Sequence, residues 1–289
     1  MKARMKQGIA AVAVALSAAT AVVGTPAAGT GWAQVQSLRA FGISADGKLM
    51  ATFTTDKPQT LDWVRLILGL VGDTAVIGID FRVQNGLMYA VGNQGGIYTI
   101  KTPPQVSDPV VTKVSQLQVP LYGNNFGVDF NPAADRLRVI SDNGQNLRHN
   151  LNDHTTIEDG TLTTPPPYGP TRGVTGAAYT NNDLSPDTAT TLYDVATATD
   201  EIVIQSPANI GTLAPIGSIG FDALPNAGFD IYSDLTNGKT TSVTGFAILN
   251  PAGASTSSLY TVNLFTGATT SVGAFPIPLG DLAIALDTN

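Results

Sequence analysis

A short glycine-led phrase recurs along the chain at nearly constant spacing, and this repeat limits the possible folds more than any other feature. The third positions of its four copies are separated by 49, 49 and 52 residues. Such a period indicates an array of supersecondary units, because one unit of this size cannot bury its own apolar face. The copies are Gly78-Ile79-Asp80-Phe81, Gly127-Val128-Asp129-Phe130, Gly176-Ala177-Ala178-Tyr179 and Gly228-Phe229-Asp230-Ile231.

Each copy opens a series of short alternating strands separated by turn residues. In one unit the turns are marked by Asn85-Gly86 and Gly95-Gly96, which are strong hairpin signals between alternating apolar runs. Four antiparallel strands in a unit predict a propeller blade, and 30 Gly with only 13% charged residues fit an all-β protein. The strands expected in this unit cover residues 77–82, 87–91, 97–100 and 110–114.

The two ends of the chain predict how the array closes. Segments 38–43, 48–53 and 63–68 supply only three strands of a first unit, whereas 280–286 supplies an inner strand with no unit after it. We therefore expect residues 34–289 to form a single five-bladed β-propeller, closed by the C-terminal strand joining the N-terminal blade. A six-bladed ring is the alternative if residues 211–224 form an extra inner strand. The longest segment expected to be irregular runs from 152 to 172.

The N-terminus has the pattern of a secretory signal peptide. Lys2, Arg4 and Lys6 precede an uncharged apolar run from 8 to 23 and then small residues up to Ala33. The run is too short for a membrane-spanning helix, so we expect a signal peptide over residues 1–33. This predicts export to the periplasm or the exterior, with no membrane insertion after cleavage.

The charge balance restricts the partners of the chain. All 22 acidic residues follow position 45 and three of the 15 basic residues lie in the leader, so the remainder carries 12 minus 22, or −10. This sign disfavours nucleic acid and anionic membranes and favours cations or basic groups. There is no cysteine, so no disulfide framework can support the fold.

The repeat places three aspartates at equivalent inner positions around one axis. Asp80, Asp129 and Asp230 are therefore candidate ligands for a hard divalent cation such as calcium. Alternatively, each carboxylate binds backbone N–H groups of its own or the neighbouring blade, and the repetition of the phrase favours this structural role.

A second concentration of polar residues follows the second copy of the phrase. Arginine side chains bind carboxylate or phosphate through paired donors, so this region is a candidate site for an anionic or sugar-like ligand. Arginine–aspartate pairs that join one blade to its neighbour are the alternative, with Asp135 pairing to Arg136 or Arg138. The candidate ligand-binding residues are Asp129, Asn131, Asp135, Arg136, Arg138, Asn146 and Arg148.

Familiar enzyme signatures are missing. The sequence has no G-x-S-x-G motif and no cysteine, and His149 and His154 are too few for a typical three-ligand zinc site. These absences favour a non-enzymatic module that binds a small molecule, a glycan or a protein. The alternative is a propeller hydrolase or lyase that acts on carbohydrate or lactone through channel carboxylates, with or without a divalent metal.

Several phrases carry a family resemblance. They are Gly78-Ile79-Asp80-Phe81-Arg82, the block from Phe126 to Val139, Gly144 to Arg148, and Leu259-Tyr260-Thr261-Val262. In these phrases the chain resembles the exported bacterial domain of unknown function numbered 4394, over essentially all of its length after the leader. The resemblance implies export and a repeat-built fold, and it carries no catalytic residue.

Overall fold

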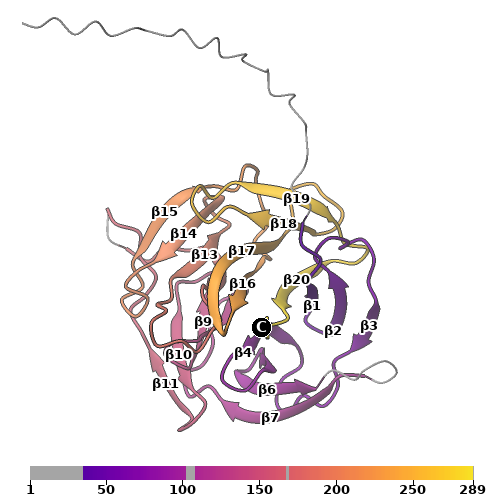
Figure 1. The fold of residues 1–289 in the computed structure, drawn as a ribbon. Helices are drawn as coiled ribbons and strands as arrows, with labels where there is room; N and C mark the ends of the chain where they lie inside the picture. Colours follow the sequence, from indigo (N-terminus) through magenta and orange to yellow (C-terminus); the bar gives the residue numbers. More distant parts are fainter. Residues whose placement is uncertain (1–34, 102–107, 167–168, 289) are drawn as a thin grey trace, which may run out of the picture. The chain divides into compact units, whose positions relative to one another are not determined.

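The computed structural model describes residues 35–101, 108–166 and 169–288, and this part of the chain contains twenty strands and no helix. The strands form five four-stranded antiparallel sheets arranged as blades around a central axis (Figure 1). The predicted five-bladed β-propeller is therefore confirmed. The predicted signal peptide, residues 1–33, lies outside the described residues. Nowhere in the described ranges is there a helix long and apolar enough to cross a membrane.

Four blades are built from consecutive strands, with the glycine-led phrase in the innermost strand of each. Blade 2 contains β4 (Val76–Arg82), β5 (Leu87–Gly92), β6 (Gly96–Lys101) and β7 (Val110–Gln116). Blade 3 contains β8 (Phe126–Asn131), β9 (Arg136–Ser141), β10 (Asn146–Asn150) and β11 (Thr155–Glu158). Blade 4 contains β12 (Val174–Tyr179), β13 (Leu192–Ala196), β14 (Glu201–Gln205) and β15 (Leu213–Ser218). Blade 5 contains β16 (Gly228–Thr236), β17 (Lys239–Leu249), β18 (Ser258–Val262) and β19 (Thr269–Ala274).

Blade 1 is assembled from both ends of the described chain. Its inner strand is β20 (Leu279–Ile284), which pairs antiparallel with β1 (Arg39–Ser44), so that Ala283 lies opposite Phe41. The blade continues with β2 (Leu49–Thr54) and β3 (Trp63–Leu66). The predicted closure by the C-terminal strand is confirmed, and it leaves no inner strand without a blade.

Two segments needed the structure to be assigned. The six-bladed alternative is wrong, because β15 is the outer strand of blade 4 and pairs with β14. The expectation of an irregular segment from 152 to 172 is also wrong, because β11 forms the outer strand of blade 3 within it. This strand is short and largely exposed, with Ile157 at 49%, so it lacks the alternating apolar pattern on which the prediction relied.

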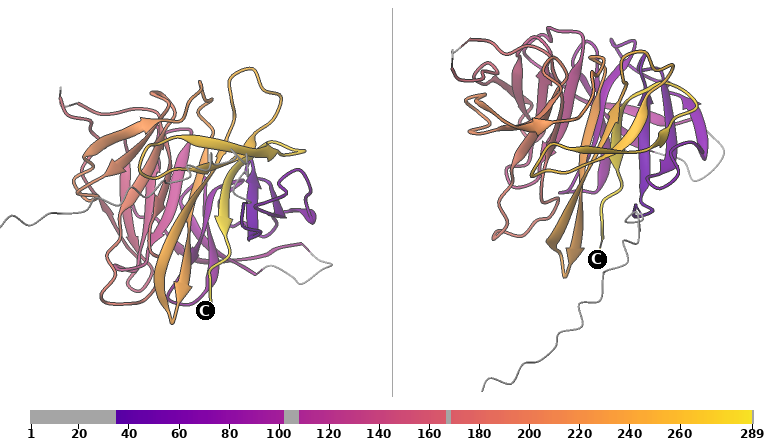
Figure 2. Two further views of the ribbon diagram at one scale, coloured as in Figure 1. Left: turned by 45° about the horizontal axis from the view of Figure 1, so that its top comes forward. Right: turned by 90° about the horizontal axis from the view of Figure 1, so that it is seen from above.

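The apolar core lies between neighbouring blades. One cluster, for example, joins Val91 and Ile97 of blade 2 to Phe130 and Val139 of blade 3. Each blade therefore buries its faces only by stacking on the next, as expected for a repeat of this kind. The hairpin of β16 and β17 is longer than the others and projects beyond them near the C-terminal end (Figure 2).

The glycine that leads each phrase allows the inner strands to approach one another. A Cβ atom on Gly127 would lie 2.6 Å from the backbone nitrogen of Ala177 in the next blade. A Cβ atom on Gly228 would lie 2.4 Å from the Cα atom of Asp281. Any larger residue at these positions would push neighbouring blades apart, so the glycines set the distance between adjacent inner strands.

Candidate functional site

Three aspartates meet on the central axis. Asp80 of β4, Asp129 of β8 and Asp230 of β16 are each at most 5% exposed. Oxygen atoms of their carboxylates lie within 4.8 Å of one another. The structure thus brings together the three residues considered as metal ligands from the sequence.

These carboxylates also join neighbouring inner strands. An inner strand is the edge of its blade, so half of its N–H groups face the axis without a partner in the sheet. In three places such a group donates to the aspartate of the preceding blade. The bonds run from Phe130 N to Asp80 Oδ2 (2.7 Å), from Tyr179 N to Asp129 Oδ1 (2.9 Å), and from Ile284 N to Asp230 Oδ2 (2.6 Å).

The remaining two inner strands follow blades that carry alanine at the equivalent position, Ala178 or Ala283. There the matching N–H groups, those of Ile231 and Phe81, donate to the aspartate just before them in their own strand, at 2.6 Å in both cases. All five equivalent N–H groups are therefore bound by a carboxylate. This pattern is the structural role that the sequence left open beside metal binding.

A fourth axial carboxylate, that of Asp281, was missed from the sequence. Asp281 occupies the position of the leading glycine in β20, is 6% exposed, and accepts a hydrogen bond from Ile79 N at 2.7 Å. The repeated aspartate stands at the third position of the phrase, where β20 carries Ala283. Comparison at the first position would have found this acidic residue in place of glycine.

Burial raises the pKa of all four axial carboxyl groups. The pKa of Asp230 rises to about 6. For Asp80, the negative charge of Asp230 raises the pKa further. For Asp129, the negative charge of Asp80 does the same. Burial is also the main cause for Asp281. Protons or a cation would relieve this concentration of negative charge.

The residues of the triad fit a hard cation in chemistry and in spacing. Ligand oxygens lie about 2.3–2.6 Å from Ca²⁺, so any two of them are at most about 5 Å apart. The 4.8 Å limit on the carboxylate oxygens of Asp80, Asp129 and Asp230 is compatible with this. Each oxygen that accepts one backbone N–H group retains a second lone pair for an ion.

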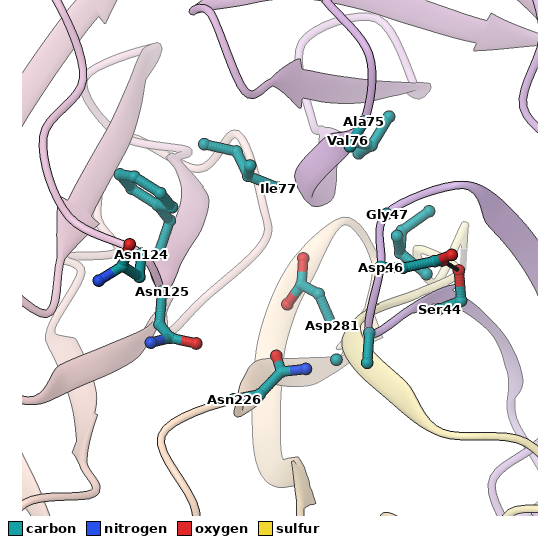
Figure 3. Close-up of a pocket in the computed structure, with 14 residues that line it drawn as sticks. Ser44, Asp46, Gly47, Ala75, Val76, Ile77, Asn124, Asn125, Asn226 and Asp281 are labelled. Carbon is teal, nitrogen blue, oxygen red and sulfur yellow. Dashed lines mark hydrogen bonds between the residues drawn. The ribbon is translucent and has the colours of Figure 1, made fainter.

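A polar cavity of about 220 Å³, the axial cavity, lies where the inner strands begin (Figure 3). Asp281 contributes to its wall and links it to the axial carboxylates. Side chains of Asn125, Asn226 and Asp281 point toward the same space in Figure 3. The polar side chains that line the cavity belong to Ser44, Asp46, Asn124, Asn125, Asn226 and Asp281.

Turns before or between the strands hold these polar groups. The Asp142 carboxylate accepts hydrogen bonds from the backbone N–H groups of Asn124 (3.0 Å) and Asn125 (3.2 Å), which fixes the loop before β8. Ser44 donates to Asp46 at 2.6 Å, and this bond is the main cause of the lowered pKa of Asp46. The lining residues include no lysine, arginine or histidine. The cavity therefore favours neutral or cationic groups over anions.

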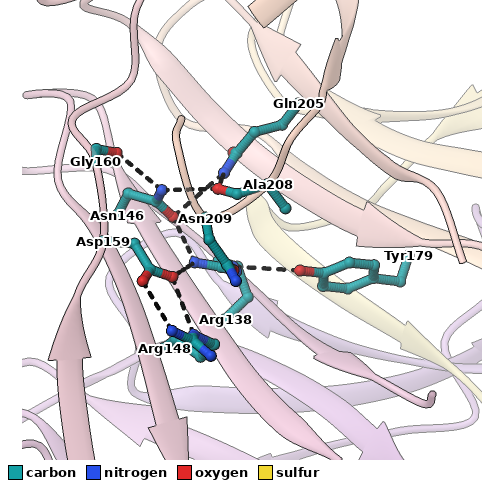
Figure 4. A network of polar contacts seen from close by, with 9 residues as sticks. All are labelled: Arg138, Asn146, Arg148, Asp159, Gly160, Tyr179, Gln205, Ala208 and Asn209. Carbon is teal, nitrogen blue, oxygen red and sulfur yellow. Dashed lines mark hydrogen bonds and ion pairs between the residues drawn. The ribbon is translucent and has the colours of Figure 1, made fainter. Parts of the chain in front are cut away.

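Arg138, one of the predicted ligand-binding residues, lies at the centre of a buried polar network between blades 3 and 4 (Figure 4). Its side chain is 3% exposed and forms an ion pair with Asp159 at 2.7 Å. It also donates to Asn146 Oδ1 (2.7 Å), Asn209 Oδ1 (2.8 Å) and Tyr179 Oη (3.3 Å).

Arg148 joins the same network by donating to both oxygens of Asp159. The two groups form an ion pair at 3.0 Å, and the Arg148 side chain remains 28% exposed. Asp159 was not considered from the sequence, because it lies beyond the motif in the segment expected to be irregular.

The other candidates divide between separate locations. Asp135 pairs with Arg82 of blade 2 at 2.6 Å, rather than with Arg136 or Arg138 as the alternative from the sequence had it. Asn131 caps a turn by accepting from Ala134 N at 3.0 Å. Asp129 lies on the axis, as described above.

Four of the seven predicted ligand-binding residues nevertheless line the same cavity, a second one of about 80 Å³. It lies between blades 3 and 4, near the ends of β8 and β12, and so at the opposite end of the inner strands from the first cavity. Asn131, Arg136, Arg138 and Arg148 line it, together with Ala134, Tyr179 and Asn209.

Comparison with known proteins identifies a family without an assigned activity. The family model described as a domain of unknown function (DUF4394) matches residues 49–283. No curated protein shows significant similarity to the chain.

Solved structures with similar architecture come from diverse proteins. Hydrazine synthase of Kuenenia stuttgartiensis is 14% identical with a TM-score of 0.40, covering 71% of this chain and 51% of that one, so this chain spans about half its length. Glutaminyl cyclase of Myxococcus xanthus is 11% identical with a TM-score of 0.43, covering 75% of this chain and 90% of that one. A protein of unknown function from Bacteroides thetaiotaomicron is 13% identical with a TM-score of 0.49, covering 87% of this chain and 68% of that one.

Proposed function

Since the chain belongs to DUF4394, a family of unknown function, we propose its role from its own geometry: an exported, non-enzymatic propeller that binds a small hydroxyl-rich ligand in the axial cavity. The observation that carries the proposal is the lining of that cavity, in which three asparagines and two carboxylates meet without a basic side chain.

The chemistry of the lining selects the ligand class. Each asparagine amide offers both donors and an acceptor, and a sugar hydroxyl group is likewise both donor and acceptor. Carboxylates such as those of Asp46 and Asp281 accept from hydroxyl or ammonium groups and repel anions. A volume of about 220 Å³ is at or below the lower limit of small-molecule sites, which suits one sugar unit rather than a long chain.

Asn226 is the residue best placed to contact such a ligand. In the described part of the chain its side-chain amide has no hydrogen-bond partner, although it lines the cavity beside Gly280 and Asp281. Ligand binding would supply the missing partners, whereas removing the amide breaks no internal hydrogen bond.

A hydrolase or lyase would have to use the axial carboxylates. These groups are buried and already accept backbone N–H groups of the inner strands. This geometry favours binding over catalysis. We include a divalent cation held by Asp80, Asp129 and Asp230 as part of the proposal, since it would neutralise charge beneath the cavity.

The test is thermal unfolding and titration calorimetry of the mature protein with a panel of monosaccharides and short glycans, with calcium or with chelator. A ligand at 100 times its Kd should add about 2.7 kcal/mol to the unfolding free energy. Asn226→Ala should weaken binding at least tenfold, whereas Asn237→Gly, at the exposed turn between β16 and β17 outside the cavity, should leave it unchanged. Binding that is unaffected by Asn226→Ala, or absent for the entire panel, would contradict the proposal.

N-terminal mass analysis of the exported protein would test the cleavage site.

A further inference from the structure

We propose that the second cavity, between blades 3 and 4, is an anion-binding site that takes a single oxyanion group such as sulfate, phosphate or the carboxylate of a ligand. The site is independent of the axial cavity, since it lies at the other end of the inner strands and has the opposite charge. Its volume of about 80 Å³ suits one such group.

The charge of the lining carries the first step of the argument. Three arginines line the cavity, and its lining contains no carboxylate. Arg138 and Arg148 share one counterion, Asp159, which is 5% exposed. Arg136 donates only to the backbone oxygens of Ala134 (3.0 Å) and Asp135 (2.8 Å) within the described ranges. These three guanidinium groups and Asp159 together carry a net charge of +2.

Other acidic groups nearby do not remove this excess. Asp135 accepts two hydrogen bonds from the Arg82 guanidinium group, at 2.7 and 2.6 Å, and so has its own counterion. Asp153 is exposed, and its carboxylate accepts hydrogen bonds from the backbone and the hydroxyl group of Thr155. Asp194 is fully buried, and burial raises the pKa of its carboxyl group well above the usual value, which favours the neutral form.

The donors that remain on the arginines carry the second step. A guanidinium group has five N–H donors. Arg138 uses four of them on Tyr179, Asn146, Asp159 and Asn209. Arg136 and Arg148 each use two in the hydrogen bonds described, which leaves three on each of these side chains. Paired donors of this kind match the oxygens of sulfate, phosphate and carboxylate.

The cavity is also held in place before any ligand arrives. Arg138 is fixed from both blades, because Asn146 and Asp159 belong to blade 3 whereas Tyr179 and Asn209 belong to blade 4. Asp159 holds Arg148 through two hydrogen bonds, at 3.1 and 3.0 Å. A site whose cations are ordered by folding loses less side-chain entropy on binding.

The experiment measures thermal unfolding and calorimetry of the full mature chain with sodium sulfate, sodium phosphate or sodium acetate, each against sodium chloride at matched ionic strength. We expect a saturable rise in Tm at low millimolar concentration of at least one oxyanion. Sulfate and phosphate also stabilise proteins nonspecifically at high concentration, so saturation is the criterion. Comparison of the three anions distinguishes a tetrahedral group from a carboxylate.

Variants separate this site from general effects of charge. Arg136→Gln should weaken anion binding at least tenfold, because it removes one positive charge and the free N–H donors of that side chain. The variant should still fold, since in the described part of the chain Arg136 bonds only to backbone oxygens. Arg136→Lys should give an intermediate loss, since it keeps the charge without the paired donors. Arg65→Gln, on blade 1, is the matched control and should bind as the original chain does. Equal shifts with oxyanions and chloride, or equal affinity in Arg136→Gln and the original chain, would overturn the inference without affecting the axial proposal.

Discussion

At the scale of single residues, the most unusual group is Asp194 on β13. Its side chain is fully buried, and neither carboxylate oxygen has a hydrogen-bond partner among the described residues. Burial raises its pKa well above the usual value, although the charge of Arg138 acts in the opposite direction. A group whose pKa is higher in the folded state than in the unfolded chain destabilises the fold as pH rises above about 3.8.

Asp194→Asn should therefore stabilise the protein at pH 7.5 and have little effect at pH 4, where the aspartate is protonated in the folded state. Each unit of raised pKa corresponds to about 1.4 kcal/mol, and 1 kcal/mol corresponds to roughly 2–4 °C in Tm for a domain of this size. We expect a gain of a few degrees at pH 7.5 in differential scanning calorimetry. Asp187→Asn, at an exposed position, is the control and should change Tm by less than about 1 °C. A loss of stability that is equal at both pH values would contradict this account.

At the scale of the strands, the axial aspartates connect each inner strand to the next. The sheet hydrogen bonds hold strands together only within a blade. Neighbouring blades are joined by side-chain packing, by hydrogen bonds between loops, by polar pairs such as Arg82 with Asp135, and by these axial carboxylate bonds. Asp129 shows the relation most simply, because it makes one such bond, with the N–H group of Tyr179.

Two substitutions at Asp129 should have opposite effects. Asp129→Ala leaves the Tyr179 N–H group buried without a partner, which costs about 1–3 kcal/mol. Asp129→Asn keeps an oxygen acceptor and removes repulsion from Asp80 and Asp230, so it should be neutral or stabilising at pH 7 with chelator present. Urea unfolding monitored by tryptophan fluorescence or circular dichroism measures both. Equal destabilisation by the two variants would indicate that the charge itself is required, as a bound cation would demand.

At the scale of the whole molecule, the closed ring concentrates negative charge on its axis. Burial raises the pKa of Asp80, Asp129, Asp230 and Asp281, so their contribution to stability is largest in acid and is lost as pH rises through the folded-state values. His149 acts in the opposite direction at lower pH. It is buried against Ser115, and burial lowers the pKa of its imidazole to about 4. Its contribution to the stability of the fold therefore increases from about pH 4 to about pH 6.5 and is constant at higher pH.

The unfolding temperature should therefore fall as pH rises from about 5 to about 6.5 in the presence of chelator, because four axial carboxyl groups lose their stabilising effect there and only His149 opposes them. A decline of several degrees is expected, because more than one coupled group contributes. The double variant Asp80→Asn and Asp129→Asn should flatten the decline, and calcium should suppress it if the triad binds the ion. A Tm that is constant or rises over this interval in metal-free buffer would show that folding does not raise the pKa values of the axial carboxyl groups.

The architecture could be predicted from the sequence in considerable detail. The glycine-led phrase marks four of the five inner strands, and the turn Asn85-Gly86 separates β4 from β5 as expected. The shortage of one strand at the N-terminus, matched by the surplus segment around Leu282, was enough to predict the closure of the ring. These features are local or strictly periodic, so they can be read along the chain without knowing which blades touch.

The candidate sites could be predicted only in part, because their partners come from distant positions. Asp281 lies 202 residues from its partner Ile79, and Arg138 lies 71 residues from Asn209. Asp135 stands next to Arg136 in sequence but pairs with Arg82 in the adjacent blade. The sequence by itself determined the repeat, most of the strands, the closure of the ring and three of the four acidic inner positions, and it favoured five blades over six. Only the tertiary structure decided which polar groups pair and which cavities remain, because closing the ring fixes those distances and no local pattern encodes them.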